Sequence, residues 1–290
     1  MLLFADDSKL YHHVSINTAQ ENCSAIQRDL TRLEDWSNSW LLRFHPGKCH
    51  VLSLGEFMKT PCRAFNYQLC GQSLEHVFEE RDLGVIIDSS LTFEPHIDQK
   101  VNVANAFLGL IRRNFRFLDQ DTMTRLFIAF VRPHLEYCHA VWSPSRVSLV
   151  RKIEAVQTRA LNLVPELRGL AYEDQLRQTK LTTLAFRRLR GDMIDCWKHL
   201  HAYHPTVICE SFQPSPRNPD RLTQSRAKTG FYHRIQELWN GLPLNVRKAD
   251  NVNLFKNRLD RHWINLPLKY DYMAKPPIRI YELDSAGRAQ

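Results

Sequence analysis

The hydrophobic period of this 290-residue chain changes near residue 95, and that change limits the folds that the chain can adopt. Before residue 95, apolar residues gather in short runs bounded by turn residues, a pattern typical of β-strands. After it, apolar residues recur every three or four positions for the rest of the chain, which favours amphipathic helices. The sequence therefore predicts an α+β protein, in which β-hairpins and one helix come first and a helical region follows.

One helix is expected over residues 19–42, because apolar side chains recur there at helical spacing: Cys23, Ile26, Leu30, Leu33 and Trp40. Asn17 and Thr18 precede this segment and can cap its first turn. Pro46-Gly47 then gives a strong turn signal. The β-prone runs that follow lie at 48–54, 65–69 and 78–87.

Beyond residue 95 two helices have clear start and stop signals. Asp119 can cap a helix whose apolar face is Met123, Leu126, Phe127 and Phe130. Pro133 must bend or end that helix, because proline has no N–H to donate and its ring clashes with the preceding turn. Ser148 can cap the next helix, which Pro165 stops and whose apolar positions are Leu149, Ile153, Val156, Ala160 and Leu163.

The opening segment Phe4-Ala5-Asp6-Asp7 places two adjacent carboxylates between an apolar run and the alternating stretch that starts at Ser8. Two unit charges roughly 4 Å apart repel each other by about 4 kcal/mol at an effective dielectric constant of 20. An uncompensated pair at a strand turn therefore calls for a cation, and Mg²⁺ is the natural candidate. A solvated acidic turn is the other interpretation of the same residues.

Charge is spread unevenly along the chain. Residues 1–142 hold 14 Lys and Arg against 17 Asp and Glu, net −3, whereas residues 143–290 hold 25 against 14, net +11. A basic helical half indicates nucleic acid as a partner. Arg187, Arg188 and Arg190 lie among apolar residues, so one helix is expected to pack its apolar stripe inward and direct its guanidinium groups outward to phosphates. A solvated helix surface is the alternative.

Several of these segments resemble the polymerases of mobile elements. Phe4-Ala5-Asp6-Asp7 resembles the palm hairpin of reverse transcriptases, in which aromatic-Ala-Asp-Asp holds the catalytic metal ions. Trp36-x-x-x-Trp40, followed by Phe-His-Pro-Gly-Lys-Cys-x-Val-Leu at 44–52, is similar to the next palm segment in non-LTR retrotransposon polymerases. Residues 83–88, Leu-Gly-Val-Ile-Ile-Asp, resemble the primer-contacting strand pair of that family.

The helical region carries the resemblance further. The sequence segments at 131–137, 141–144 and 153–157 resemble the thumb of jockey-like and chicken-repeat-like retrotransposon polymerases. Those at 187–192, 238–243 and 255–260 look like the carboxy-terminal tail of the same elements. The resemblance spans residues 1 to about 264 and implies an RNA-directed DNA polymerase, a nucleotidyltransferase whose partners are an RNA template and a DNA primer.

The resemblance also assigns roles to residues. Asp6 and Asp7 become the catalytic ligands of Mg²⁺ or Mn²⁺, with no small-molecule cofactor. Lys48 becomes a proton donor or electrostatic stabiliser near the departing pyrophosphate, the alternative being a solvated lysine beside a turn. Leu83 and Gly84 belong to the strands that hold the primer end, where glycine gives the backbone clearance.

The chain begins inside the palm of such a polymerase, so a truncated product is expected. Fingers, endonuclease and a palm strand with a further aspartate precede this point in the family, and two-metal catalysis needs both ions clamped together. Independent polymerase activity is therefore not expected. Two other functions stay open: a non-enzymatic nucleic-acid-binding module that uses residues 143–264, and a helical protein-interaction scaffold.

The domain boundaries follow from the same segments. Residues 1–94 are expected to be a partial palm, 95–210 the thumb and its connection, 211–229 a proline-rich linker, 230–264 a C-terminal helical pair and 265–290 a loose tail. Seven cysteines without a C-x-x-C pair argue against a disulfide framework or a zinc ribbon. The chain shows no signal-peptide core and no apolar run of membrane-spanning length, so an intracellular protein, nuclear or cytoplasmic, is expected.

Overall fold

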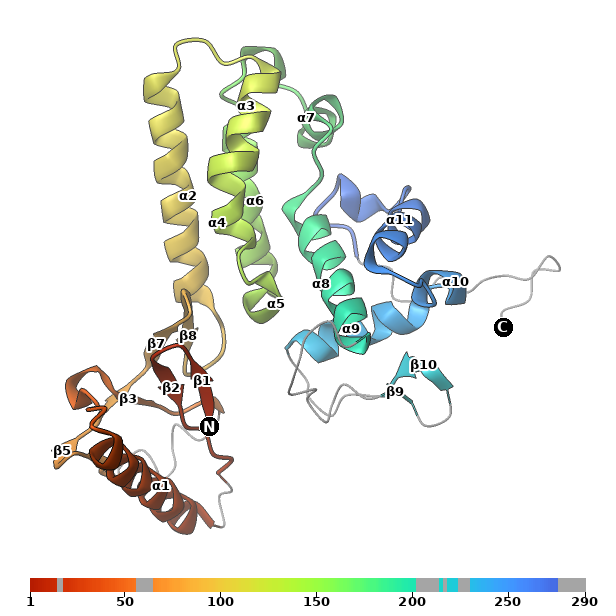
Figure 1. The fold of residues 1–290 in the computed structure, drawn as a ribbon. Helices are drawn as coiled ribbons and strands as arrows, with labels where there is room; N and C mark the ends of the chain where they lie inside the picture. The colour runs from red at the N-terminus through yellow and green to blue at the C-terminus, as the bar shows by residue number, and fades with distance from the viewer. Residues whose placement is uncertain (15–17, 56–64, 202–213, 216–217, 224–229, 276–290) are drawn as a thin grey trace. The chain divides into compact units, whose positions relative to one another are not determined.

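The computed structural model describes residues 1–14, 18–55, 65–201, 214–215, 218–223 and 230–275. The chain divides into two compact units, residues 1–96 and 97–290. The described residues form helices and small two-stranded sheets (Figure 1), which confirms the α+β prediction.

The first unit combines one long helix with short strand pairs. Its antiparallel hairpins are β1 with β2 (Leu2–Phe4, Asp7–Lys9), β4 with β5 (Gln68–Leu69, Gln72–Ser73) and β7 with β8 (Glu79–Asp82, Val85–Asp88). Strand β3 (His50–Leu52) follows the short 3-10 helix η2 (Pro46–Lys48) and pairs in parallel with β6 (Glu75–Val77). The β-prone runs of the sequence therefore contain strands, each shorter than the run that predicted it.

Helix α1 (Ala19–Trp40) confirms the helix expected at 19–42. It packs Cys23 and Leu30 against Tyr67, Leu69 and Leu74, and these residues form the core of the unit. Trp40 was expected on the apolar stripe but is 67% exposed, because the helix ends there and the next residue turns the chain in the left-handed region. Of the two expected caps, Thr18 makes no capping hydrogen bond, and Asn17 lies outside the described residues.

The second unit begins with a series of helices, several of which run alongside one another in Figure 1. They are α2 (Glu94–Asn114), α3 (Gln120–Leu126), the π-helical segment η5 (Phe127–Val131), α4 (Arg132–Glu136), α5 (His139–Trp142), α6 (Val147–Leu161), the 3-10 helix η6 (Pro165–Leu167) and α7 (Tyr172–Thr179). Buried residues recur in α2 at alternating steps of four and three: Ile97, Val101, Ala104, Leu108 and Ile111. Helix α6 repeats that spacing with Leu149, Ile153, Val156 and Ala160, the pattern of a coiled-coil seam.

The start and stop signals of these helices are partly confirmed. Asp119 caps α3 by accepting a hydrogen bond of 2.8 Å from the backbone N–H of Thr122. The helix does not end at Pro133; it widens into η5 first, because the missing proline N–H removes one hydrogen bond from the helical ladder. Ser148 lies inside α6, whose N-cap is Arg146, so the cap expected at Ser148 is wrong.

The rest of the second unit packs around helix α8 (Leu184–Leu200). The elements that follow it are β9 (Pro214–Ser215), β10 (Asn218–Leu222), α9 (Phe231–Gly241), α10 (Leu244–Arg247), α11 (Val252–His262) and the 3-10 helix η7 (Pro267–Lys269). Their shared core contains three tryptophans, Trp197, Trp239 and Trp263, together with Phe255. Leu222, from the segment assigned to a linker, lies in this core, and so do Leu266 and Leu268, from the segment assigned to a tail.

None of the helices in the described ranges combines the length and the apolar character that crossing a membrane requires.

Candidate metal hairpin and nucleic-acid interface

Asp6 and Asp7 lie on a tight β-hairpin. Phe4 pairs with Asp7 across the two strands, so Ala5 and Asp6 form the two-residue turn. Ala5 has a φ of 51°, in the left-handed region where residues other than glycine are uncommon. Such backbone strain persists where the surroundings enforce it and tends to cluster at functional sites. The sequence Phe-Ala-Asp-Asp therefore forms the strand–turn–strand that its apolar flanks indicate.

Both carboxylates are exposed, and neither pairs with a cation among the described residues. Lys9, two positions after Asp7, forms an ion pair with Asp82 of β7 instead. Because no described cation neutralises the two aspartates, the tip of the hairpin is a negative point open to a hard cation. Carboxylate oxygens are the ligands that Mg²⁺ prefers, and Mg²⁺ often binds through one or two carboxylates with water and phosphates as its other ligands.

The hairpin supplies only part of the coordination shell of a metal ion. Within the described ranges, no group of three or more His, Cys, Asp or Glu side chains lies close enough together to hold a metal ion. The donor type at Asp6 and Asp7 fits magnesium, and the number of donors fits an ion that keeps several water ligands.

Lys48 closes the 3-10 turn η2, where its N–H donates to the His45 carbonyl oxygen at 2.9 Å. Its side chain is exposed, and the described contacts do not join it to Asp6 or Asp7. The role expected for Lys48 therefore stays a prediction.

Leu83 and Gly84 form the tip of the β7–β8 hairpin and are not part of its strands. Their φ values are 44° and 83°, and two successive positive values are typical of a type I′ turn, which suits glycine at the second position. At the far end of β8, the Asp88 carboxylate accepts backbone N–H bonds from Ser90, Thr92 and Phe93. The hairpin is therefore held at its base, and at its tip Leu83 is 42% exposed.

The three arginines of α8 lie in different surroundings. Arg187 makes a two-pronged ion pair with Glu136, and Arg190 makes one with Asp260 at 2.5 and 2.7 Å. Arg188 is only 3% exposed, so the prediction that its guanidinium group faces outward is wrong. Adjacent helical residues point about 100° apart, so positions 187, 188 and 190 spread over about 160° of the helix circumference, and Arg188 lies on the side that packs against other helices.

Arg188 belongs to a buried charge network that the sequence analysis missed. Burial lowers the pKa of Arg188, and the carboxylates of Glu154 and Asp192 oppose that shift. Burial raises the pKa of Glu154, whose carboxylate accepts hydrogen bonds from the Tyr172 hydroxyl at 2.8 Å and from the Ala185 N–H at 2.6 Å. The network therefore stabilises the packing of α6 and α7 against α8.

A second part of the network fixes α9 and α5 to α8. Burial raises the pKa of Asp192, although the ion pair with Arg234, at 2.7 Å, favours the charged form. Arg234 also donates to the Ala140 carbonyl oxygen at 3.0 Å, and His139 lies 3.5 Å from the Asp192 carboxylate. Glu154, Arg188 and Asp192 lie in segments that resemble the thumb and tail, whereas Arg234 and His139 lie outside those segments. The burial of the first three indicates a structural role.

Comparison with known proteins identifies relatives of the chain. It is 25% identical over 172 residues to the probable RNA-directed DNA polymerase from transposon BS of Drosophila melanogaster, a match that covers 56% of this chain and 18% of the relative. It is 27% identical over 150 residues to the RNA-directed DNA polymerase from mobile element jockey of Drosophila funebris, covering 50% and 16%. The chain is related to jockey-like reverse transcriptases. The family resemblance seen in the sequence is thereby confirmed.

The match to these jockey-like polymerases spans less than a fifth of their length. An uncharacterized protein of Caenorhabditis elegans is 25% identical over 111 residues, which cover 37% of this chain and 56% of that protein. No family model matches the chain. No solved structure matches it either.

Proposed function

We propose that this chain is part of the RNA-directed DNA polymerase of a non-LTR retrotransposon, with residues 1–94 as part of its palm and 95–210 as its thumb and connection. One observation carries the proposal. A chain related to jockey-like polymerases presents Phe-Ala-Asp-Asp on a strand–turn–strand, with both carboxylates exposed and unpaired. The resemblance of this segment to the palm hairpin of reverse transcriptases implies that it is the metal-binding element.

Asp6 and Asp7 would each give a carboxylate oxygen to Mg²⁺ or Mn²⁺. A bound divalent ion supplies charge neutralisation and orientation for phosphates in nucleotidyl transfer. Lys48 would act near the departing pyrophosphate, and the tip at Leu83 and Gly84 would approach the primer strand. The RNA template and DNA primer would lie against the second unit, where residues 97–290 carry 31 Lys and Arg against 18 Asp and Glu, net +13.

This chain is proposed to bind metal and nucleic acid but not to polymerise nucleotides by itself. A two-metal site needs ligands that clamp both ions roughly 3.5 to 4 Å apart. The described residues provide no third carboxylate close to Asp6 and Asp7. One weakly held ion is therefore the expected state of the isolated chain.

The test is a titration with Mn²⁺, followed by paramagnetic line broadening in the NMR spectrum. We expect resonances of residues 4–9 to broaden first, and we expect Asp6→Asn with Asp7→Asn to abolish that broadening. Glu21→Gln with Asp35→Asn is the matched control, because it removes two exposed carboxylates of α1 and leaves the hairpin intact. Equal broadening in the wild type and in the hairpin variant would reject the metal site.

A second candidate is a nucleic-acid-binding module without catalysis. The observation that favours it is the concentration of positive charge in residues 97–290, while residues 1–96 hold 8 Lys and Arg against 13 Asp and Glu, net −5. In that case, the affinity for a primer-template would fall steeply as the salt concentration rises. It would not change when EDTA removes divalent ions or when Asp6 and Asp7 are substituted. Dependence of the affinity on divalent ions and on these aspartates favours the polymerase assignment.

A further inference from the structure

The connection between α2 and α3 is both basic and aromatic. The last turn of α2 and the first residues of the connection read Arg112-Arg113-Asn114-Phe115-Arg116-Phe117, and all six residues are exposed. Phe117 is 84% exposed, and the Arg116 guanidinium carbon lies 5.8 Å from the centre of its ring. Exposure of the apolar ring surface to water is unfavourable, and this surface is removed from water when a partner covers it.

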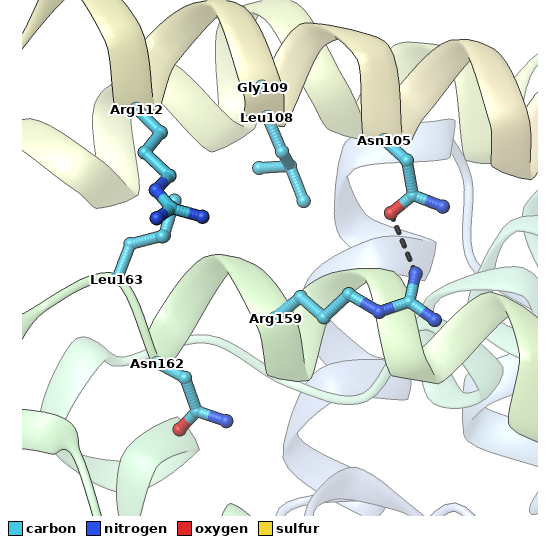
Figure 2. Close-up of a pocket in the computed structure, with 7 residues that line it drawn as sticks. All are labelled: Asn105, Leu108, Gly109, Arg112, Arg159, Asn162 and Leu163. Carbon is cyan, nitrogen blue, oxygen red and sulfur yellow. Dashed lines mark hydrogen bonds between the residues drawn. The ribbon is translucent and has the colours of Figure 1, made fainter.

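A cationic groove lies next to this connection, between α2 and α6 (Figure 2). Its volume is about 450 Å³. Arg112 enters it from α2 and Arg159 from α6, as Figure 2 shows, and the Arg159 guanidinium donates to the Asn105 amide oxygen at 2.7 Å. Gly109 lies on the wall of the groove, where an added Cβ atom would meet no atom within 4 Å.

The polar pairs along the two helices explain why this end is cationic. Lys152 of α6 pairs with Asp98 of α2 at 2.5 Å, and seven residues further along each helix Arg159 pairs with Asn105. Seven more residues bring α2 to Arg112, which has no anionic partner among the described residues. Along the described parts of the two helices, Lys152 therefore has a carboxylate partner, Arg159 has an amide partner, and Arg112 has no anionic partner. Positive charge remains unneutralised at the C-terminal end of α2, beside the aromatic connection.

Few carboxylates oppose this charge. Residues 99–118 contain four Lys or Arg and no Asp or Glu. Asp119 follows directly, but its carboxylate is engaged by Thr122, and the hydrogen bond from the Thr122 N–H lowers its pKa. Asp121 is the next acidic residue along the chain after Asp119, and Glu166 is the next after Arg159.

We propose that the α2–α3 tip, residues 112–117 together with the groove arginine Arg159, binds single-stranded nucleic acid. Phosphate groups occupy the groove between Arg112 and Arg159, and a base stacks on the exposed face of Phe117. Exposed aromatic rings favour a single strand, because the bases of a duplex are already stacked on one another. This inference rests on the proposed function, since it assigns a subsite for the nucleic acid that the polymerase would handle.

The experiment measures fluorescence anisotropy of a labelled 20-nucleotide single strand with the full chain at several salt concentrations. We expect Arg112→Gln with Arg159→Gln to weaken binding at least tenfold and to reduce the salt slope by about 1.4, since each lost phosphate contact on a single strand removes about 0.7. Arg261→Gln, which removes an exposed arginine of α11, is the charge control and should change affinity less than twofold.

Phe117→Leu tests the stacking independently of charge. Loss of one stacked base should weaken binding about fivefold or more, because base–aromatic stacking contributes about 1 to 3 kcal/mol. The same variant should bind an abasic strand of equal length as well as the wild type does, since that strand has no base to stack. Phe130→Leu, at a residue that is 52% exposed in η5, is the matched control.

The outcomes separate this inference from the proposed function. If the wild type binds single strands and primer-template while the tip variants bind equally well, the tip inference is overturned and the polymerase assignment stands. If the tip variants lose affinity for duplex only, the single-strand assignment is overturned. If the wild type binds no nucleic acid at all, both proposals are rejected together.

Discussion

Gly191 lies in the interior of α8, where the ring of His139 approaches the helix backbone. A Cβ atom built at Gly191 would lie 2.5 Å from Nε2 and 2.6 Å from Cε1 of His139. The ring is held from its other side, because its Nδ1 lies 3.1 Å from the Glu136 carbonyl oxygen. Gly191→Ala should therefore force the His139 ring out of its place beside Asp192.

The expected magnitude combines two opposing terms. Alanine is favoured over glycine in a helix interior by about 1 kcal/mol. Overpacking of a filled site costs about 1 to 3 kcal/mol. Gly191→Ala should thus lower the free energy of unfolding by about 0 to 2 kcal/mol, since the steric cost exceeds the gain in helix propensity.

Gly109 offers a matched control within the same unit. It also lies inside a long helix, α2, but a Cβ atom there would meet nothing within 4 Å. Gly109→Ala should therefore raise the free energy of unfolding by about 1 kcal/mol. In a unit of this size, 1 kcal/mol moves the melting temperature by roughly 2 to 4 °C, so the two variants should melt roughly 2 to 12 °C apart.

Thermal unfolding followed by circular dichroism at 222 nm measures both variants. Adding His139→Ala to Gly191→Ala should recover part of the lost stability, because the clashing ring is gone, and a double-mutant cycle gives the size of that coupling. Equal stabilisation by Gly191→Ala and Gly109→Ala would refute the close approach of His139 to α8.

Three further outcomes follow from local features of the structure. Asp119→Asn keeps the cap of α3 but removes a carboxyl group whose pKa is lowered by the hydrogen bonds from Thr122. Above the pKa of that carboxyl group in the unfolded chain, the wild type should therefore melt at a higher temperature than the variant. As the pH falls through the lowered pKa of the folded state, the two melting temperatures should converge. Arg234→Met leaves the Asp192 charge buried and should cost about 3 kcal/mol in urea unfolding, with Asp192→Leu recovering much of it. Ala5→Gly should relieve left-handed strain of about 1 kcal/mol, seen as slower amide exchange in the β1–β2 hairpin.

Local signals in the sequence predicted the local structure well. The acidic hairpin at Asp6 and Asp7, the helix at 19–42 and the Asp119 cap each depend on a few neighbouring residues whose turn, cap or period preferences agree. Where two local signals compete, the sequence does not decide between them. Ser148 is a good cap in isolation, yet α6 starts at Val147, since its buried seam from Leu149 to Ala160 sets where the helix lies.

The side-chain environments of α8 could not be predicted, because they depend on contacts between distant segments. The partners of Arg187, Arg190 and Arg188 come from α4, α11 and α6, up to 70 residues away in the chain. Helical spacing alone spreads the three arginines over about 160° of the helix, which one polar face can hold, so the burial of Arg188 had no signal in the sequence. The tip at 112–117 had a signal, basic residues alternating with phenylalanines, but only the structure places Arg159 opposite Arg112.

The proposal that the acidic hairpin at Asp6 and Asp7 holds a divalent ion at the primer end is tested most directly by hydroxyl-radical cleavage from Fe²⁺ loaded on the chain. Ascorbate and peroxide generate radicals at the bound iron, and an end-labelled primer-template reports where they cut. We expect cuts within a few nucleotides of the primer end with the wild type, and none with Asp6→Asn and Asp7→Asn. Cuts scattered along the duplex, or an identical pattern with the variant, would contradict the account.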